Sequence, residues 1–212
     1  TLRVRVYTVM ITKFSDLDLS KSYTYKDYLT WQFKERVELI LGKIFKMSPA
    51  SQSDHQHVSA VLSGQFYNYL KGKECKFFAS PFDVRLPVTN KKNEVNTVVQ
   101  PDLCVICDPT IIDAKGCDGV PDLIVEIISK SSVDRDLHEK YDLYQECGVK
   151  EYWILHPNDK TLVIHTLEGG QYKPSKMLTR GDFARSKVLP GLEVDLTEVF
   201  EDVVYEQRGD YS

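Results

Sequence analysis

The stretch PDLIVEIIS, residues 121–129, decides the fold, because it reads as a buried β-strand with one carboxylate in its centre. Isoleucine and valine residues make a nearly continuous apolar run on both sides of Glu126. A carboxylate that is removed from water is costly unless it is paired, protonated or bound to a metal. The position of Glu126 therefore predicts a partner for it inside the protein.

A second apolar strand carries a carboxylate at its start. In TVVQPDLCVICD, residues 97–108, Asp102 follows Pro101 and lies 24 residues before Glu126. If the two strands are neighbours, both carboxylates can point into one cleft. A third acid, Glu38, stands in the apolar segment RVELI. Three acids on apolar strands can coordinate a hard cation such as Mg²⁺ through oxygen ligands.

The remaining patterns predict helices and hairpins around these strands. Residues 53–70 place apolar side chains at helical spacing, and Thr24 with Asp27 resembles a helix N-cap with an acidic first turn. Gly148 is typical of the end of another long helix. We expect helices over 25–33, 53–70 and 132–147, hairpins over 36–48 and 151–168, strands over 76–88, 97–108 and 121–129, and a short strand with a helical turn within 187–200.

The order of these elements predicts an α/β fold, in which a mixed β-sheet is flanked by helices and carries additional β-hairpins. Residues 1–22 are expected to form a peripheral N-terminal segment, and residues 23–212 a single domain. No internal repeat or low-complexity linker interrupts the sequence, which favours one domain over several.

Composition and charge exclude several classes of protein. The 212 residues are 42% hydrophobic and 27% charged, with a net charge of −4, which is ordinary for a water-soluble protein. No apolar run approaches the ~20 residues of a membrane helix, so we expect no membrane contact. A nucleic-acid surface would have to be a local patch, because the whole molecule is acidic.

The five cysteines are scattered through a chain without a recognisable export signal, which favours reduced thiols and a cytoplasmic location. Cys104 and Cys107 form a C-x-x-C, but they lie in an expected strand, where they point to opposite faces. No second cysteine or histidine pair follows at the spacing of a zinc site. We therefore expect these two cysteines to be buried strand residues.

Three segments together resemble a known family. QPDLCVI, then PDLIVEIIS, then DLHEKYDLYQECGVKEYWIL closely resemble the Uma2 or DUF820 group of restriction endonuclease-like proteins, within the PD-(D/E)XK nuclease superfamily. The resemblance runs from about Tyr23 to the C-terminal strand. It implies a restriction endonuclease-like fold, cleavage of DNA that depends on Mg²⁺ or Mn²⁺, and metal ligands at Asp102, Glu126 and Glu38.

The chain departs from the superfamily pattern at one position. The superfamily's lysine normally follows the second acid by two residues, and Ile128 stands there. Lys140 on the following helix is the expected substitute, with Lys130 ranked below it. The ammonium would stabilise charge on the phosphoryl oxygens, while the metal would activate a water. The resemblance and the aromatic-rich hairpin over 151–168 further suggest a homodimer.

Five residues are candidate contacts to DNA. Arg85, Lys91 and Lys92 stand in or before a polar loop that suits contacts to phosphates. His55 could approach the cleft as a phosphate contact or a general base, although a polar residue at a helix start also explains it. Tyr141 could touch a phosphate, although packing of the helix explains it as well.

Each expected site residue also has a structural explanation. Asp102 could cap a turn after Pro101. Glu126 and Lys140 could form a buried ion pair without a metal, or Lys140 could be a solvated helix residue. Glu38 could be an outward strand residue that faces a basic side chain across its hairpin. The sequence therefore leaves two functions open, a metal-dependent endonuclease and a nuclease-like module that binds or assembles without catalysis.

Overall fold

The computed structural model describes residues 10–47, 53–128 and 135–202. The chain divides into two compact units, and each unit is built from several separate stretches of the sequence. Unit 1 comprises residues 1–49, 82–100 and 110–120, and unit 2 comprises residues 50–81, 101–109 and 121–212.

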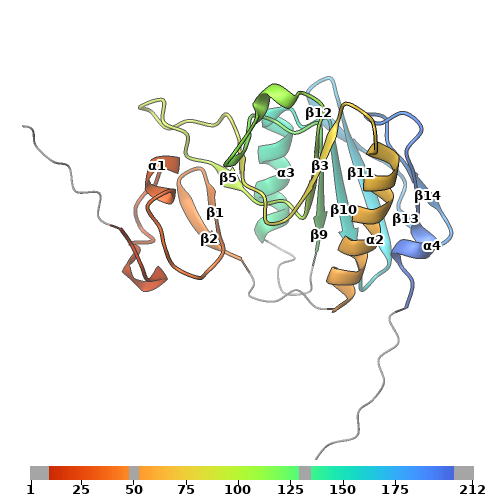
Figure 1. Ribbon diagram of the computed structural model, residues 1–212, viewed down its shortest axis with the longest axis horizontal. Helices are drawn as coiled ribbons and strands as arrows, with labels where there is room; N and C mark the ends of the chain where they lie inside the picture. The colour runs from red at the N-terminus through yellow and green to blue at the C-terminus, as the bar shows by residue number, and fades with distance from the viewer. Residues whose placement is uncertain (1–9, 48–52, 129–134, 203–212) are drawn as a thin grey trace, which may run out of the picture. The chain divides into compact units, whose positions relative to one another are not determined.

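Unit 2 is built on a seven-stranded mixed sheet (Figure 1). Its main path runs in the order β12 (Gln171–Pro174), β11 (Thr161–Glu168), β10 (Glu151–His156), β9 (Leu123–Ile127), β6 (Leu103–Ile106) and β3 (Lys76–Ala79). β9 and β10 are parallel, and the other neighbours are antiparallel. Three further strands are β13 (Leu178–Thr179), which pairs with β11, and the separate pair β14 (Phe183–Arg185) and β15 (Glu193–Asp195).

Two long helices, α2 (Ser53–Leu70) and α3 (Arg135–Cys147), cover opposite faces of this sheet, and the short α4 (Leu196–Val199) packs near α2 (Figure 1). Successive side chains of a strand point to opposite faces. Val125 of β9 therefore lies in the core beneath α2, whereas Glu126 faces α3. This arrangement confirms the predicted fold class, a mixed sheet flanked by helices.

Helix α2 forms because its apolar residues recur at helical spacing, as predicted. Val58, Leu62, Phe66 and Leu70 are buried against the sheet. The ring of Phe66 meets Trp153 of β10 edge-on, with ring centroids 5.6 Å apart. Full burial of one such side chain contributes about 1.5–3 kcal/mol. Packing of this apolar stripe therefore holds α2 in place.

Helix α3 ends where the sequence predicted. The described part begins at Arg135, and the predicted start at residue 132 lies outside the described residues. The last residue is Cys147, and Gly148 then adopts a φ of 88°. The N–H groups of Gly148 and Val149 both donate to the carbonyl of Tyr144. This left-handed glycine closes the helix, because it satisfies carbonyls that the helix leaves unpaired.

Unit 1 contains a smaller sheet of six strands. Residues 10–22, expected to be peripheral, contribute the buried side chain of Leu17 and a β-bridge between Ile11 and Trp31. The strands, in sheet order, are β2 (Lys43–Lys46), β1 (Val37–Ile40), β5 (Val98–Val99), β4 (Val84–Arg85), β8 (Gly116–Asp118) and β7 (Ile112–Asp113). The helical segments along the chain are η1 (Phe14–Asp16), α1 (Tyr25–Tyr28) and η2 (Pro109–Ile111).

The hairpin of β1 and β2 confirms the turn predicted about Leu41 and Gly42. The two residues have φ values of 50° and 80°, and a two-residue hairpin turn of this kind requires both φ angles to be positive. A Cβ added to Gly42 would lie 2.1 Å from the hydroxyl oxygen of Ser22. Only glycine fits this position.

The helix expected over residues 25–33 is wrong in length. Thr24 and Asp27 do form the N-terminal capping box, but the helix ends at Tyr28. Trp31 instead joins a β-bridge and packs within a cluster of aromatic rings. This packing outweighs the intrinsic helix propensity of residues 29–33, because propensities differ by only about a few tenths of a kcal/mol per residue.

The strands expected over 76–88 and 97–108 are each divided between the two sheets. The first becomes β3 and β4, and the second becomes β5 and β6. Pro81 and Pro101 stand at the divisions. Proline has no N–H to donate to a neighbouring strand, so a sheet ladder ends there.

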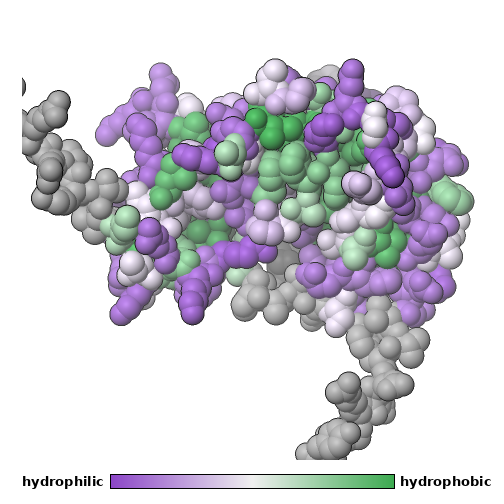
Figure 2. Space-filling model, viewed as in Figure 1, coloured by the Kyte–Doolittle hydropathy of each residue, from purple (hydrophilic) through white to green (hydrophobic). Residues whose placement is uncertain are grey.

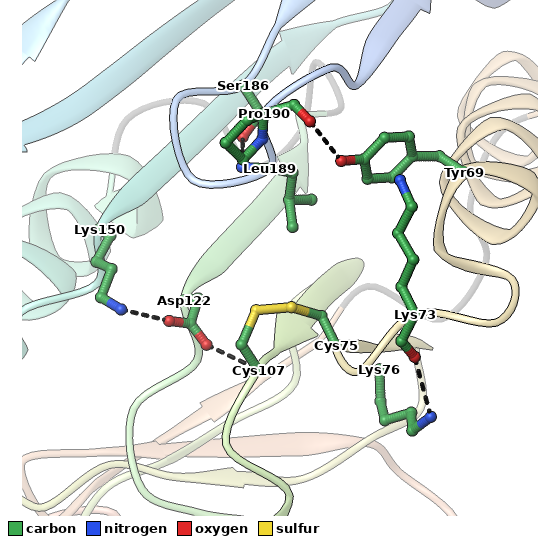
Figure 3. Close-up of a disulfide and its surroundings, with 10 residues drawn as sticks. All are labelled: Tyr69, Lys73, Cys75, Lys76, Cys107, Asp122, Lys150, Ser186, Leu189 and Pro190. Atoms are coloured by element: carbon green, nitrogen blue, oxygen red, sulfur yellow. Dashed lines mark hydrogen bonds and ion pairs between the residues drawn. A yellow bond between two sulfur atoms is a disulfide. The ribbon is translucent and has the colours of Figure 1, made fainter.

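A disulfide joins Cys75 to Cys107 at one end of the paired strands β3 and β6 (Figure 3). The expectation of five reduced thiols is therefore wrong for this pair, because strand pairing brings together two cysteines that lie 32 residues apart. Asp122 accepts the Cys107 N–H at 2.7 Å and pairs with Lys150 at 2.6 Å (Figure 3). Three cysteines keep their thiols: Cys104, Cys117 and Cys147.

Breaking this disulfide should destabilise the protein. A cross-link over 32 residues restricts the unfolded chain by an amount worth about 3–4 kcal/mol. Cys75→Ser should lower the free energy of unfolding by about that amount in chemical denaturation without reductant. Dithiothreitol should bring the wild type to the same level, and Cys147→Ser should match the wild type. Equal stability of Cys75→Ser and wild type under oxidising conditions would contradict the cross-link.

Hydrophilic residues predominate around the edges of the face drawn in Figure 2, and apolar residues gather near its centre. Within the described ranges, no helix combines the length and the apolar character needed to cross a membrane. The large apolar side chains exposed in the described part of the chain are Met10, Leu19, Leu29, Leu41, Tyr67, Met177 and Phe183.

Candidate active site

Strand pairing brings Asp102 and Glu126 to the same end of unit 2's sheet. β6 and β9 are antiparallel neighbours, with Leu103 opposite Val125. Asp102 stands in a bend directly before β6, next to the end of β9 that carries Glu126. The Asp102 carboxylate also accepts the N–H of Ile127 at 2.7 Å. The predicted neighbouring strands are confirmed as β6 and β9, with Asp102 one residue before β6, and a cleft shared by the two carboxylates stays a prediction.

His55, in the first turn of α2, reaches the same carboxylate. Its Nε2 lies 3.3 Å from Asp102 Oδ1, and the two side chains are 13% and 19% exposed. Burial alone lowers the pKa of His55, but the hydrogen bond and charge of Asp102, with the charge of Glu126, outweigh it and raise that pKa above 6.5. His55 therefore lies beside Asp102, and its role as a phosphate contact or a general base stays a prediction.

Lys140 forms a buried ion pair with Glu126. Its Nζ lies 3.0 Å from Glu126 Oε1, and the two side chains are only 8% and 9% exposed. The reading of Lys140 as a solvated helix residue is therefore wrong. Two charges taken out of water at this depth require each other, because removal of one partner costs about 3–5 kcal/mol. The ion pair with Lys140, which the sequence offered as the alternative to a metal ligand role for Glu126, is thus present.

Tyr144 is the site residue that sequence reasoning missed. Its hydroxyl donates to the same oxygen, Glu126 Oε1, at 2.9 Å. Tyr141 points elsewhere and packs against His165 and Tyr172, with ring centroids 5.1 and 5.2 Å apart. A signal was available, because residues four apart share a helix face, and Tyr144 follows Lys140 by four.

The superfamily's lysine position is apolar in the structure as well. Ile128 is 8% exposed, and its N–H donates to the carbonyl of Leu155 at 2.8 Å. By the two-residue period of a strand, Ile128 follows Glu126 on the same side. Lys130, the second candidate for the missing charge, lies outside the described residues.

Glu38 is buried within unit 1, where it is 4% exposed. Its Oε1 accepts the backbone N–H of Gln100 at 2.8 Å, and Gln100 directly precedes Pro101 and Asp102 in the chain. The alternative reading of Glu38 as an outward strand residue is therefore wrong. Its part in a metal site stays a prediction.

The candidate DNA contacts in unit 1 differ in accessibility. Lys91 and Lys92 are exposed in a tight turn, in which Asn90 Oδ1 accepts the Lys92 N–H at 2.8 Å. Arg85 is only 3% exposed, and its guanidinium donates to Asp113 at 2.8 Å. A contact between Arg85 and a phosphate would first have to break that ion pair. The exposed lysines fit the predicted role better.

The carboxylates of unit 2 are compatible with a magnesium-type cation. Mg²⁺ is usually held by one or two protein carboxylates, while waters and substrate phosphates supply the remaining oxygens. Asp102 and Glu126 provide that number from adjacent strands. A group of three or more His, Cys, Asp or Glu side chains arranged as a metal site does not occur in the described ranges. A cation held by these two carboxylates stays a prediction.

Comparisons with known proteins bear on the fold and the family of this chain. The chain matches the family model Uma2, described as "Putative restriction endonuclease", over residues 25–197. It is similar to the uncharacterized protein slr1290 of Synechocystis sp. (strain ATCC 27184 / PCC 6803 / Kazusa), with 32% identity over 134 residues. That alignment covers 61% of this chain and 66% of the relative, just under two thirds of its length.

A solved structure shows the same fold. The crystal structure of a "putative nuclease belonging to DUF820" from Anabaena variabilis ATCC 29413 matches with a TM-score of 0.65. The match covers 84% of this chain and 97% of that chain at 15% sequence identity. The family model spans Asp102, Glu126 and Lys140 together. The fold and the sequence match agree, and this chain belongs to the Uma2 family.

Proposed function

We propose that this chain is a metal-dependent endonuclease that hydrolyses phosphodiester bonds of DNA. The observation that carries the proposal is the pair of carboxylates on adjacent strands, with the ammonium of Lys140 buried 3.0 Å from Glu126 Oε1. Asp102, at the end of the neighbouring strand, would supply the second carboxylate of a metal-assisted hydrolase. Membership of a family described as "Putative restriction endonuclease" supports the same class of reaction.

Asp102 and Glu126 would hold Mg²⁺ or Mn²⁺, with Glu38 as a further proposed ligand. When bound, such a cation supplies a water of lowered pKa and polarises the scissile phosphate. Asp102 is already oriented, because the N–H of Ile127 fixes one of its oxygens at 2.7 Å. The protein thereby prepares its ligands before the substrate arrives.

Lys140 would replace the superfamily's lysine. Its ammonium is a compact point charge on a flexible stem. The ammonium would turn from the Glu126 carboxylate toward a phosphoryl oxygen, where negative charge increases in the transition state. The buried setting strengthens this interaction relative to water. His55 would add an N–H contact to the same phosphate.

The remaining contacts to DNA are proposed for Lys91, Lys92, Tyr141 and Arg85, in order from the most exposed side chains to the most buried.

A single domain over 23–212, with 1–22 peripheral, remains our proposal. A homodimer and a cytoplasmic location are also proposals. The dimer rests on family resemblance, because Tyr152 and Trp153 of the aromatic hairpin are fully buried within unit 2. The disulfide, which suits an oxidising compartment, weighs against the location.

A cleavage assay tests the function directly. The full chain should convert supercoiled plasmid or single-stranded DNA to shorter products with Mg²⁺ or Mn²⁺, and EDTA should stop the reaction. Melting curves on the same samples should show that Mn²⁺ stabilises the protein, because a ligand that binds only the native state raises its stability. Absence of both cleavage and stabilisation would favour the alternative, a nuclease-like module that binds without catalysis.

A further inference from the structure

One oxygen of the Glu126 carboxylate accepts two hydrogen bonds from α3. Lys140 Nζ lies 3.0 Å from Glu126 Oε1, and the Tyr144 hydroxyl lies 2.9 Å from it. The two donors differ in rigidity. Lysine places its charge on a stem of four rotatable carbons, whereas tyrosine has two side-chain torsions and a flat ring. The hydrogen bond from Tyr144 therefore restricts the position of the carboxylate more than the bond from Lys140 does.

The ring of Tyr144 is fixed by its surroundings. Tyr144 is 0% exposed, and its ring meets that of Tyr152 nearly at right angles, with centroids 5.1 Å apart. Tyr152 stands on β10, which is the parallel neighbour of β9. The hydroxyl of Tyr144 is thus held in place by the strand beside the one that carries Glu126. An anchored donor of this kind keeps its position when the lysine moves.

We infer that Tyr144 is a positioning residue for Glu126, one that sets the orientation of the proposed metal-binding carboxylate and hence the affinity for the cation. A hydroxyl that is held in place restricts the position of Oε1 and so limits the orientations open to the planar carboxylate. The inference rests on the proposed function. It explains how Lys140 can leave Glu126 for a phosphate while the carboxylate keeps its orientation, because Tyr144 still holds Oε1.

The test measures metal binding rather than cleavage. Tyr144→Phe removes the hydroxyl and keeps the ring, so its melting temperature in EDTA should stay within a few degrees of wild type. Its dissociation constant for Mn²⁺, measured on the full chain by calorimetry, should rise about tenfold or more, as expected when a hydrogen-bond partner of a metal ligand is lost. Tyr172→Phe, which removes another buried hydroxyl of unit 2, one that donates to the Val149 carbonyl, is the matched control and should bind Mn²⁺ like wild type.

A second variant separates the tyrosine from the lysine. Lys140→Met leaves Tyr144 on Glu126 Oε1, so its Mn²⁺ dissociation constant should stay at or below the wild-type value. The double variant Lys140→Met/Tyr144→Phe should bind Mn²⁺ more weakly than Lys140→Met does. Because this comparison starts from a different background, it tests the inference even if Tyr144→Phe alone folds poorly.

The possible results separate a failure of the inference about Tyr144 from a failure of the proposed function. Wild-type affinity in Tyr144→Phe overturns the inference, and the proposed function still stands if Glu126→Gln loses Mn²⁺. A loss of affinity in Lys140→Met equal to that in Tyr144→Phe also overturns it, because the lysine would then orient the carboxylate. A wild type that binds no Mn²⁺ overturns the inference and the metal-dependent function together.

Discussion

Glu126→Gln is expected to abolish metal binding and DNA cleavage together. Glutamine keeps the size of the side chain, but an amide oxygen binds a hard cation far less well than a carboxylate does. In the wild type, Mn²⁺ at a hundred times its dissociation constant should add about 2.7 kcal/mol to the free energy of unfolding, or roughly 5–10 °C in melting temperature. The variant should show no such shift, and its cleavage rate should fall by about 10³-fold or more.

The control must separate lost metal binding from lost folding. Glu126→Gln leaves the Lys140 ammonium buried without its carboxylate, at a cost of about 3–5 kcal/mol. Glu126→Gln/Lys140→Met removes both charges and should fold about as stably as wild type, still without a response to Mn²⁺. Glu139→Gln changes an exposed glutamate of the same helix and should behave as wild type. A full Mn²⁺ shift in Glu126→Gln would place the cation elsewhere.

Lys140→Met should reduce cleavage while leaving metal binding intact. Methionine keeps the apolar stem and removes only the charge, so the rate at saturating Mn²⁺ should fall about 10²–10³-fold through loss of transition-state stabilisation. The Mn²⁺-induced rise in melting temperature should be equal to that of wild type or larger, because the site becomes more negative. Single-turnover cleavage and thermal melting on the same samples measure the two effects.

Ile128 offers a rescue of the lysine. Lys140→Met/Ile128→Lys returns an ammonium to the superfamily's position, two residues after Glu126 and on the same side of the strand. Partial recovery of cleavage would show that a charge near Glu126 is sufficient, wherever the chain supplies it. Introduction of a lysine at a site only 8% exposed has a cost, so recovery should be incomplete. Cleavage at the wild-type rate by Lys140→Met alone would exclude the migrated lysine and direct attention to Lys130.

The variant Asp102→Asn distinguishes a nuclease from a module without catalysis. A module without catalysis could keep the ion pair of Lys140 and Glu126, and the contacts of Asp102 with His55 and the Ile127 N–H, as structural features alone. Asp102→Asn would then leave all functions unchanged apart from a small loss of stability. A nuclease would lose both its response to Mn²⁺ and its cleavage in that variant.

The sequence by itself determined those parts of the fold whose signals are local. The apolar spacing in 53–70 predicted α2 and its buried residues, since a helix repeats every 3.6 residues. The turn at Leu41 and Gly42 followed from the backbone freedom of glycine. The apolar strands that carry Asp102 and Glu126 revealed two acids out of place, and their order along the chain identified the family.

Only the tertiary structure decided which side chains meet. It selected Tyr144 over Tyr141 as the partner of Glu126, and it buried Arg85 beside Asp113. The tertiary structure also formed the disulfide between Cys75 and Cys107, and it ended α1 at Tyr28. Each outcome depends on contacts between residues far apart in the chain. A local pattern records which face of a helix or strand is apolar, but not which neighbour that face will meet once the sheet has formed.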